Sequence, residues 1–195
     1  MDTLQELFEG TLRNVYYAEK QIVKTLPKMA KKATSEHVVE SFRIHLDQTQ
    51  SQIARLEKVF ELLDSSPKGK KCDAIQGIIK EAEGLIKKAK EHTVRDAALL
   101  AAASAVEHYK ISRYGTLSAW AQKLGLPEAA HLLEETLHEE KHADEKLSKL
   151  TVSEINVRAN SEIHDQDDND EQSRKASAPR LKASKRSSIQ GPTGE

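Results

Sequence analysis

Four acidic side chains occupy positions where helical periodicity calls for apolar residues. At about 100° per residue, Glu19 falls at the centre of the first apolar stripe in the chain and Glu107 at the centre of a later one. Glu140 and Asp144 complete a third stripe that is otherwise formed by leucines. Unpaired buried carboxylates are costly, and a cation among them is the simplest way to keep several ionised. These acids therefore predict a metal site.

Pairing within the protein is the alternative explanation for the same acids. A single glutamate on an apolar stripe is more often paired with Lys, Arg or Tyr than bound to a metal. Lys110 and Tyr114 share a helix with Glu107 and are the possible internal partners, whereas few other basic residues share the inward faces. Both explanations stay open at this point.

The segment HLDQTQSQIARLE offers weaker ligands. His45 lies at the edge of its apolar stripe, with Gln48 and Gln52 on the same flank. An imidazole is a ligand that iron accepts, whereas a glutamine carbonyl coordinates a hard cation poorly. A polar, hydrogen-bonded flank explains these three residues equally well.

The metal motif Glu-x-x-His occurs twice, as Glu135 with His138 and Glu139 with His142. At helical pitch both pairs fall largely off the apolar face, and the two histidines lie roughly opposite it. We therefore expect His138 and His142 to face solvent rather than bind metal.

Helical periodicity accounts for nearly all of the chain up to residue 150. Pro27 lies inside the first helix and should kink it or end its regular part. Short turns join the first two long helices and the last two, and a long crossover with its own helix lies between the pairs. This is the connectivity of an all-α, ferritin-like four-helix bundle, in which two metals bridged by carboxylates are a known arrangement. The expected helices span about 3–32, Ser35 (as N-cap) to about 63, 73 (Asp73 as cap) to 91, 94–124 and 127–150.

Composition narrows the class of protein. The 195 residues carry 30 Lys and Arg against 31 Asp and Glu, a balance that does not favour binding to nucleic acid. The single cysteine, Cys72, excludes an internal disulfide. The first residues lack the features of a secretion signal, and no apolar run is long enough to span a membrane. We expect a cytoplasmic protein without membrane association.

The composition changes after residue 151, so we expect residues 1–151 to form the bundle and 152–195 a disordered polar tail. The tail has no aromatic residue, and its acidic run SEIHDQDDNDE precedes the basic run RKASAPRLKASKR. The basic end offers a contact for nucleic acid or anionic lipid, but a solvated tail is the preferred interpretation.

The motifs of residues 2–150 resemble those of the YciF-like family, a ferritin-like group named for a bacterial stress-induced protein. The resemblance rests on YAEKQIVKTLPKMA, HLDQTQSQIARLE with VFELL, Cys72 ahead of GIIKEAEGLI, VEHYKISRYGTL and LLEETLHEEKHADEKL, in this order. It implies a fold similar to that of rubrerythrins and a two-metal site, usually assumed to hold iron, in proteins linked to general and osmotic stress. The resemblance supports Glu19, Glu107, Glu140 and Asp144 as ligands.

The sequence departs from that pattern at Gln48, where such proteins often have Glu, and at Gln52, where some have His.

The expected function is a stress protein that binds one or two iron or manganese ions and acts on oxygen, peroxide or Fe(II), with Tyr16 and Tyr114 as hydrogen-bond donors to the site. The alternative is a non-catalytic structural or interaction bundle with internally paired acids. The resemblance further implies a homodimer.

Overall fold

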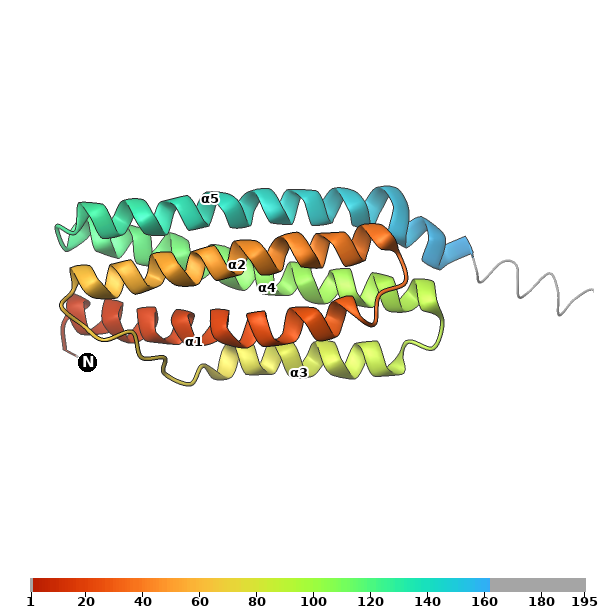
Figure 1. Cartoon of the computed structure of the whole chain (residues 1–195), viewed down its shortest axis with the longest axis horizontal. Helices are drawn as coiled ribbons and strands as arrows, with labels where there is room; N and C mark the ends of the chain where they lie inside the picture. Colours follow the sequence, from red (N-terminus) through yellow and green to blue (C-terminus); the bar gives the residue numbers. More distant parts are fainter. Residues whose placement is uncertain (1, 162–195) are drawn as a thin grey trace, which may run out of the picture. The chain divides into compact units, whose positions relative to one another are not determined.

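The computed structural model describes residues 2–161, and the part of the chain that it describes is helical with no strand. The five helices run parallel or antiparallel to a common axis (Figure 1). Each lies within a few residues of its expected position. Their bounds are α1 Leu4–Ala30, α2 Glu36–Leu62, α3 Asp73–Lys88, α4 His92–Lys123 and α5 Pro127–Leu150.

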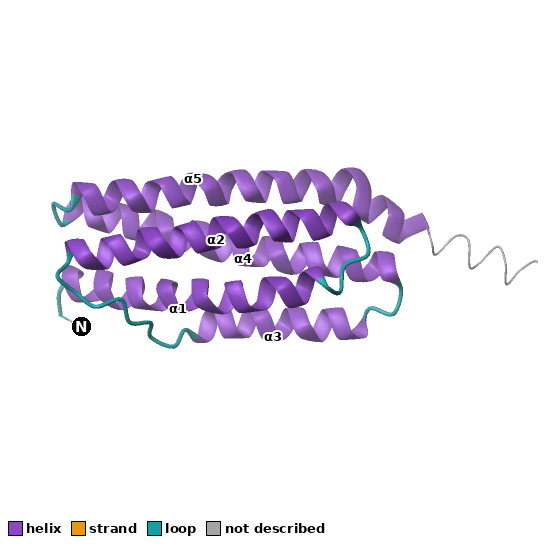
Figure 2. Cartoon of the chain, in the orientation of Figure 1, coloured by secondary structure: helices purple, strands orange, loops and turns teal. Residues whose placement is uncertain are grey.

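Two hairpins build the bundle. Short loops join α1 to α2 and α4 to α5, whereas the longer connection from α2 passes through α3 before α4 begins (Figure 2). Helix α1 also packs on α4, and α2 on α5, while α3 covers the outside of α1 and α4. The ferritin-like connectivity inferred from loop lengths is confirmed.

Local signals explain where most of the helices begin and end. The Thr3 hydroxyl accepts a hydrogen bond from the Glu6 backbone N–H and caps α1. Gly125 ends the turn after α4 with φ of 72°, a left-handed conformation that favours glycine, and Pro127 opens α5. Pro27 lies in the last turn of α1, which continues only to Ala30.

One predicted cap, Asp73, differs from the structure, and the other, Ser35, is confirmed in position only. Asp73 is the first residue of α3, and its N-cap is Cys72. Ser35 is the N-cap residue of α2, but its side chain makes no capping bond. Asp96 of α4 instead accepts hydrogen bonds from the backbone N–H groups of Thr34 and Ser35 and from the Thr34 hydroxyl. A buried carboxylate from a distant helix thus holds the two residues that lead into α2.

Buried polar residues divide the core of the bundle into two apolar clusters. On α2, for example, Phe42 belongs to one cluster and Leu56 to the other, with buried His45, Thr49 and Gln52 between them. The other three bundle helices show the same order of apolar, polar and apolar residues along their lengths.

The helical part of the chain ends ten residues later than the expected boundary at residue 151. Helix α5 passes into a π-helical turn, Thr151–Ile155, and the chain then stays α-helical to Ser161. Ile155 is 1% exposed and packs in the same apolar cluster as Leu147, which explains why this polar segment remains attached to the bundle. The remainder of the predicted tail, 162–195, lies outside the described residues. No helix among residues 2–161 is long and apolar enough to cross a membrane.

Candidate metal centre

Each of the four bundle helices sends a carboxylate or a histidine into the same polar layer. Glu19 comes from α1, His45 from α2, Glu107 from α4 and Glu140 from α5. The three glutamates are at most 1% exposed and His45 is 8% exposed. The helical phase read from the sequence therefore places these four residues correctly.

A lysine occupies the middle of the acid group. Lys110 Nζ lies 2.9 Å from Glu140 Oε2 and 3.3 Å from Glu19 Oε2, and it donates a 2.8 Å hydrogen bond to Gln52 Oε1. Lys110 is 1% exposed, and the pull of the surrounding glutamates raises its pKa against the opposing effect of burial. The internal cation considered in the sequence analysis is thus present.

Gln52 and Tyr114 complete this ion-pair network. The Gln52 amide donates to Glu140 Oε1 at 2.6 Å and to Glu139 Oε2 at 2.9 Å. The Tyr114 hydroxyl donates to Glu19 Oε1 at 2.7 Å, as expected of a tyrosine close to the site. The Gln52 carbonyl oxygen already accepts a hydrogen bond from Lys110. Gln52 therefore supports the site through hydrogen bonds and does not offer a free oxygen to a metal.

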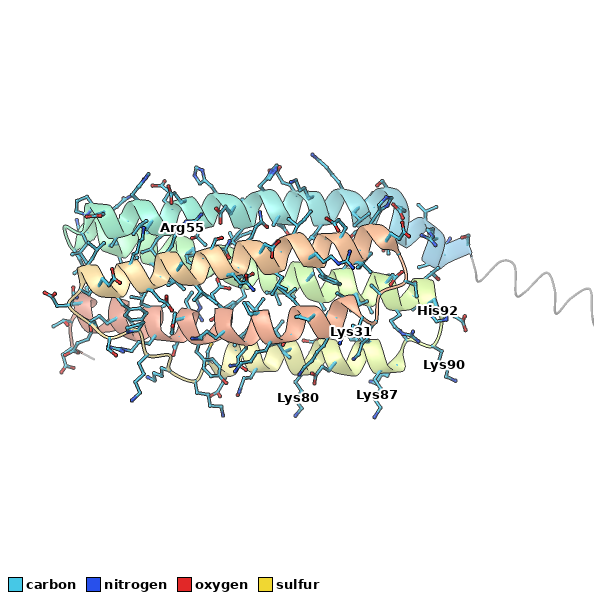
Figure 3. The ribbon with its side chains drawn as sticks, in the orientation of Figure 1. Lys31, Arg55, Lys80, Lys87, Lys90 and His92 are labelled. Atoms are coloured by element: carbon cyan, nitrogen blue, oxygen red, sulfur yellow. The ribbon has the colours of Figure 1, made fainter. Side chains whose placement is uncertain are left out.

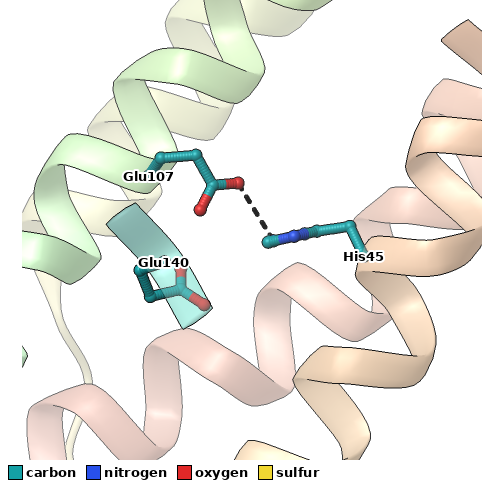
Figure 4. A group of neighbouring side chains, drawn as sticks. All are labelled: His45, Glu107 and Glu140. Atoms are coloured by element: carbon teal, nitrogen blue, oxygen red, sulfur yellow. Dashed lines mark ion pairs between the residues drawn. The ribbon is translucent and has the colours of Figure 1, made fainter. Parts of the chain in front are cut away.

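His45, Glu107 and Glu140 form a second group (Figure 4), which Glu140 connects to Lys110. One potential ligand atom from each lies within 4.8 Å of those from the other two, and His45 Nε2 is 3.1 Å from Glu107 Oε1. Within the described residues, His45 Nε2, Glu107 Oε2 and Glu140 Oε2 are buried without a hydrogen-bond partner, although Glu140 Oε2 also lies close to Lys110 as an ion pair. Buried polar atoms left in this way are rare in folded proteins and fit a bound cation.

Burial and neighbouring charges shift the pKa values of the polar layer in different directions. Burial, followed by the negative charge of Glu140, raises the pKa of Glu107 well above its usual range. Burial raises the pKa of Glu19 to about 7, although Lys110 pulls it down. Burial and the nearby Lys110 lower the pKa of His45 to about 4, so its imidazole is neutral at pH 7 and keeps a lone pair for a metal.

The charges of the polar layer do not balance when all its acids are ionised. Three carboxylates, Glu19, Glu107 and Glu140, face one ammonium, Lys110, which leaves two negative charges. One divalent cation would neutralise them. His45, Glu107 and Glu140 supply the nitrogen and oxygen atoms that iron and manganese accept, so the residues present fit one such ion.

Arg55, which the sequence analysis did not single out, flanks the site between α2 and α5 (Figure 3). Its guanidinium holds both oxygens of Glu139 and lies 3.2 Å from Glu135 Oε2. Both glutamates of the two Glu-x-x-His motifs are thus engaged by an arginine, and His138 and His142 are exposed, as expected. The sequence signal for this pairing was the spacing on α2. Arg55 follows Gln52 by three residues, so both side chains lie on the same side of the helix.

Three other candidates lie apart from the buried group. The structure does not place Asp144 with the other three acids, since it accepts a 3.2 Å hydrogen bond from Ser104 Oγ and lies 3.3 Å from His108 Nδ1 at a partly exposed position. Gln48 is half-buried and lines a cavity next to His45. The expectation for Tyr16 is wrong, because its hydroxyl donates to Glu57 Oε1 at 2.7 Å.

Comparison with known proteins confirms the resemblance read from the sequence. The family described as "Domain of unknown function (DUF892)" matches residues 3–160. Protein YciF of Escherichia coli (strain K12) is 44% identical over 161 residues, which are 82% of this chain and 96% of YciF. The crystal structure of this E. coli stress protein matches with a TM-score of 0.76 and 43% identity, covering 80% of this chain and 99% of that one.

Two further structures are similar. YcfI of Rhodopseudomonas palustris, proposed to be a structural protein, matches with 47% identity and a TM-score of 0.75, over 76% of this chain and 94% of YcfI. A ferritin-like, diiron-carboxylate protein of Bacillus anthracis (strain Ames) matches with a TM-score of 0.59 over 77% of this chain and 99% of that one. Its identity is only 18%, so this likeness concerns the fold alone.

Proposed function

The chain belongs to the DUF892 family together with YciF, and from this membership and the geometry of its core we propose that it binds one divalent metal ion, iron or manganese, through His45, Glu107 and Glu140. YciF is described as a stress protein, and we propose a role in stress for this chain as well. The cytoplasm and a homodimeric state, both expected from the sequence, are parts of the same proposal.

The observation that supports the proposal is the convergence of buried ligand atoms. Ligand atoms of His45, Glu107 and Glu140 lie within 4.8 Å of one another in the bundle core, and Glu107 Oε2 is buried there without a hydrogen-bond partner among the described residues. A divalent ion at this place would favour the ionised form of Glu107, whose pKa burial raises.

Lys110 favours one ion over two. Its ammonium already bridges Glu19 and Glu140, and these would be the carboxylates of a second metal site. A second divalent ion would add more positive charge than the two negative charges that Lys110 leaves in the polar layer.

When bound here, iron or manganese would supply a redox-active centre that reacts with oxygen or peroxide. The protein residues would contribute in two ways. His45 stays neutral at pH 7 and is available as a ligand, and Lys110 fixes the orientation of the Glu140 carboxylate through the ion pair and through Gln52.

Metal counting with matched variants tests the proposal. Chelator-treated full-length protein, titrated with Mn(II) or with anaerobic Fe(II), should bind close to one ion per chain and melt at a higher temperature when loaded. Glu107→Gln and His45→Gln should lose this ion, whereas the control Asp144→Asn should keep it. Absence of both binding and a shift in melting temperature would contradict the proposal.

A structural or interaction bundle is the second candidate, and the ion pairs of Lys110 support it. The ammonium compensates part of the buried charge without any metal. In that case Glu107→Gln should leave the melting temperature insensitive to added metal, as in the parent protein. The same titration therefore distinguishes the two functions.

A further inference from the structure

A cavity of about 360 Å³ opens beside the polar layer and is lined by all five helices. Most of its lining is apolar, with Leu26 from α1, Phe42 from α2, Ile86 from α3, Val106 from α4 and Leu147 from α5. Its volume lies within the range of pockets that bind small organic molecules, about 300–1,000 Å³. The cavity is therefore large enough to hold an aliphatic chain.

Three lysines surround this apolar space on its solvent side. Lys28 and Lys32 come from α1 and Lys146 from α5, and all three line the cavity while remaining exposed. Within residues 2–161 none of these ammonium groups is paired with a carboxylate. Glu83 is the exposed acid that lines the same cavity, so positive charge exceeds negative charge at the rim.

An apolar interior with a cationic rim is complementary to one kind of ligand. We propose that this cavity binds a monocarboxylate with an unbranched aliphatic chain, with the chain in the apolar space and the carboxylate at Lys28, Lys32 and Lys146. The buried end of the cavity reaches Glu107, where a ligand carboxylate would lose its hydration away from the three lysines. The ligand therefore binds with its charged end outward.

Calorimetric titration of the full-length protein with sodium decanoate, below its micelle concentration and with a chelator present, tests the site. We expect saturable binding with a negative change in heat capacity. Octanoate should bind more weakly, by about fourfold for each methylene group removed from the cavity. Failure of decanoate to bind, including failure because a second copy of the chain covers the cavity, would overturn the proposal.

Rim variants test the role of the lysines. Lys28→Gln with Lys32→Gln should weaken decanoate binding about two- to fivefold for each ammonium lost and leave the binding of uncharged decanol unchanged. The matched control is Lys80→Gln with Lys87→Gln, because both side chains point away from the bundle on α3 and neither lines the cavity (Figure 3). Equal binding of decanoate by the parent and the rim variant would contradict the assignment. Since chelator is present throughout, failure here leaves the proposed metal site untouched.

Discussion

Lys110 Nζ lies 2.9 Å from Glu140 Oε2, and both side chains are 1% exposed. The same ammonium reaches Glu19 on α1 and Gln52 on α2, so one side chain links four helices. Desolvation makes the net value of a buried ion pair small, but removal of one partner leaves a buried charge without compensation. This asymmetry makes Lys110 the most informative residue to change.

Replacement of Lys110 by Met should destabilise the metal-free protein by about 3–5 kcal/mol in urea unfolding, because Glu140 and Glu19 lose their cation. The matched control is Lys24→Met on α1, where the lysine is exposed, and this change should fall within about 0.5 kcal/mol of the parent. If Lys110→Met left the free energy of unfolding unchanged, the ammonium would not compensate the charge of the acids.

The number of bound ions should follow the fixed charge of the polar layer. In a double variant, Gln48→Glu with Lys110→Met, the layer and its edge carry four carboxylates and no ammonium. We expect about two Mn(II) ions per chain for this variant and about one for the parent, counted by elemental analysis after gel filtration. One ion in both proteins would show that Lys110 does not limit occupancy.

The stability of the metal-free protein should fall as the pH rises from 6.5 to about 8. In the folded chain the pKa of Glu19 is raised to about 7 from an ordinary value of 4.5, and that of Glu107 is raised as well. The folded state therefore binds protons that the unfolded state has already released, and this advantage is lost as pH rises through the folded pKa. Urea unfolding at several pH values measures the trend.

His45 opposes this trend at lower pH. Its folded pKa is lowered to about 4 from 6.5, so below pH 6.5 the unfolded state gains a proton there, which offsets part of the stability that the two glutamates add as the pH falls. Above pH 6.5 this opposing contribution from His45 is absent. Glu19→Gln should flatten part of the decline, and a parent stability that increases between pH 6.5 and 8 would contradict a protonated Glu19.

His138 and His142 should be dispensable for metal binding, although each belongs to a Glu-x-x-His motif. Both side chains are exposed on α5, and Arg55 engages Glu139 and Glu135 of the two motifs. Replacement of both histidines by Gln should leave the metal count unchanged and the stability within about 0.5 kcal/mol. Loss of metal in this double variant would show that α5 presents another face to the site.

Helical periodicity was sufficient to predict the bundle and most of its polar layer. Glu19 and Glu107 stand at the centres of apolar stripes about 100° wide, so a phase error of up to about 50° would not have moved them out of the core, and Glu140 completes a third stripe. Asp144 lies one turn beyond Glu140, where the stripe turns toward the edge between α4 and α5, and its hydrogen bond from Ser104 was not predictable from α5 alone.

Partners from other helices explain the remaining differences. The position of Lys110 showed that it faces inward, but its distances to Glu19 and Glu140 depend on how α4 lies against α1 and α5. The end of the helical region was misplaced because residues 152–161 are mostly polar and the buried isoleucine, Ile155, is the last residue of a π-helical turn that interrupts the 3.6-residue period. The composition of a segment indicates its average burial, and it does not reveal that one buried side chain, here Ile155, anchors the segment.

The polar layer between the two apolar clusters also fixes the axial register of the helices. Leucines and alanines pack against one another in many alternative positions, so apolar contacts alone would tolerate a slide of one helix by a turn, about 5.4 Å. Such a slide of α4 would carry Lys110 out of reach of Glu140 and Glu19 and leave three charges in an apolar environment. The network therefore makes the slipped arrangements unfavourable and allows one alignment of the hairpins, with or without a metal ion.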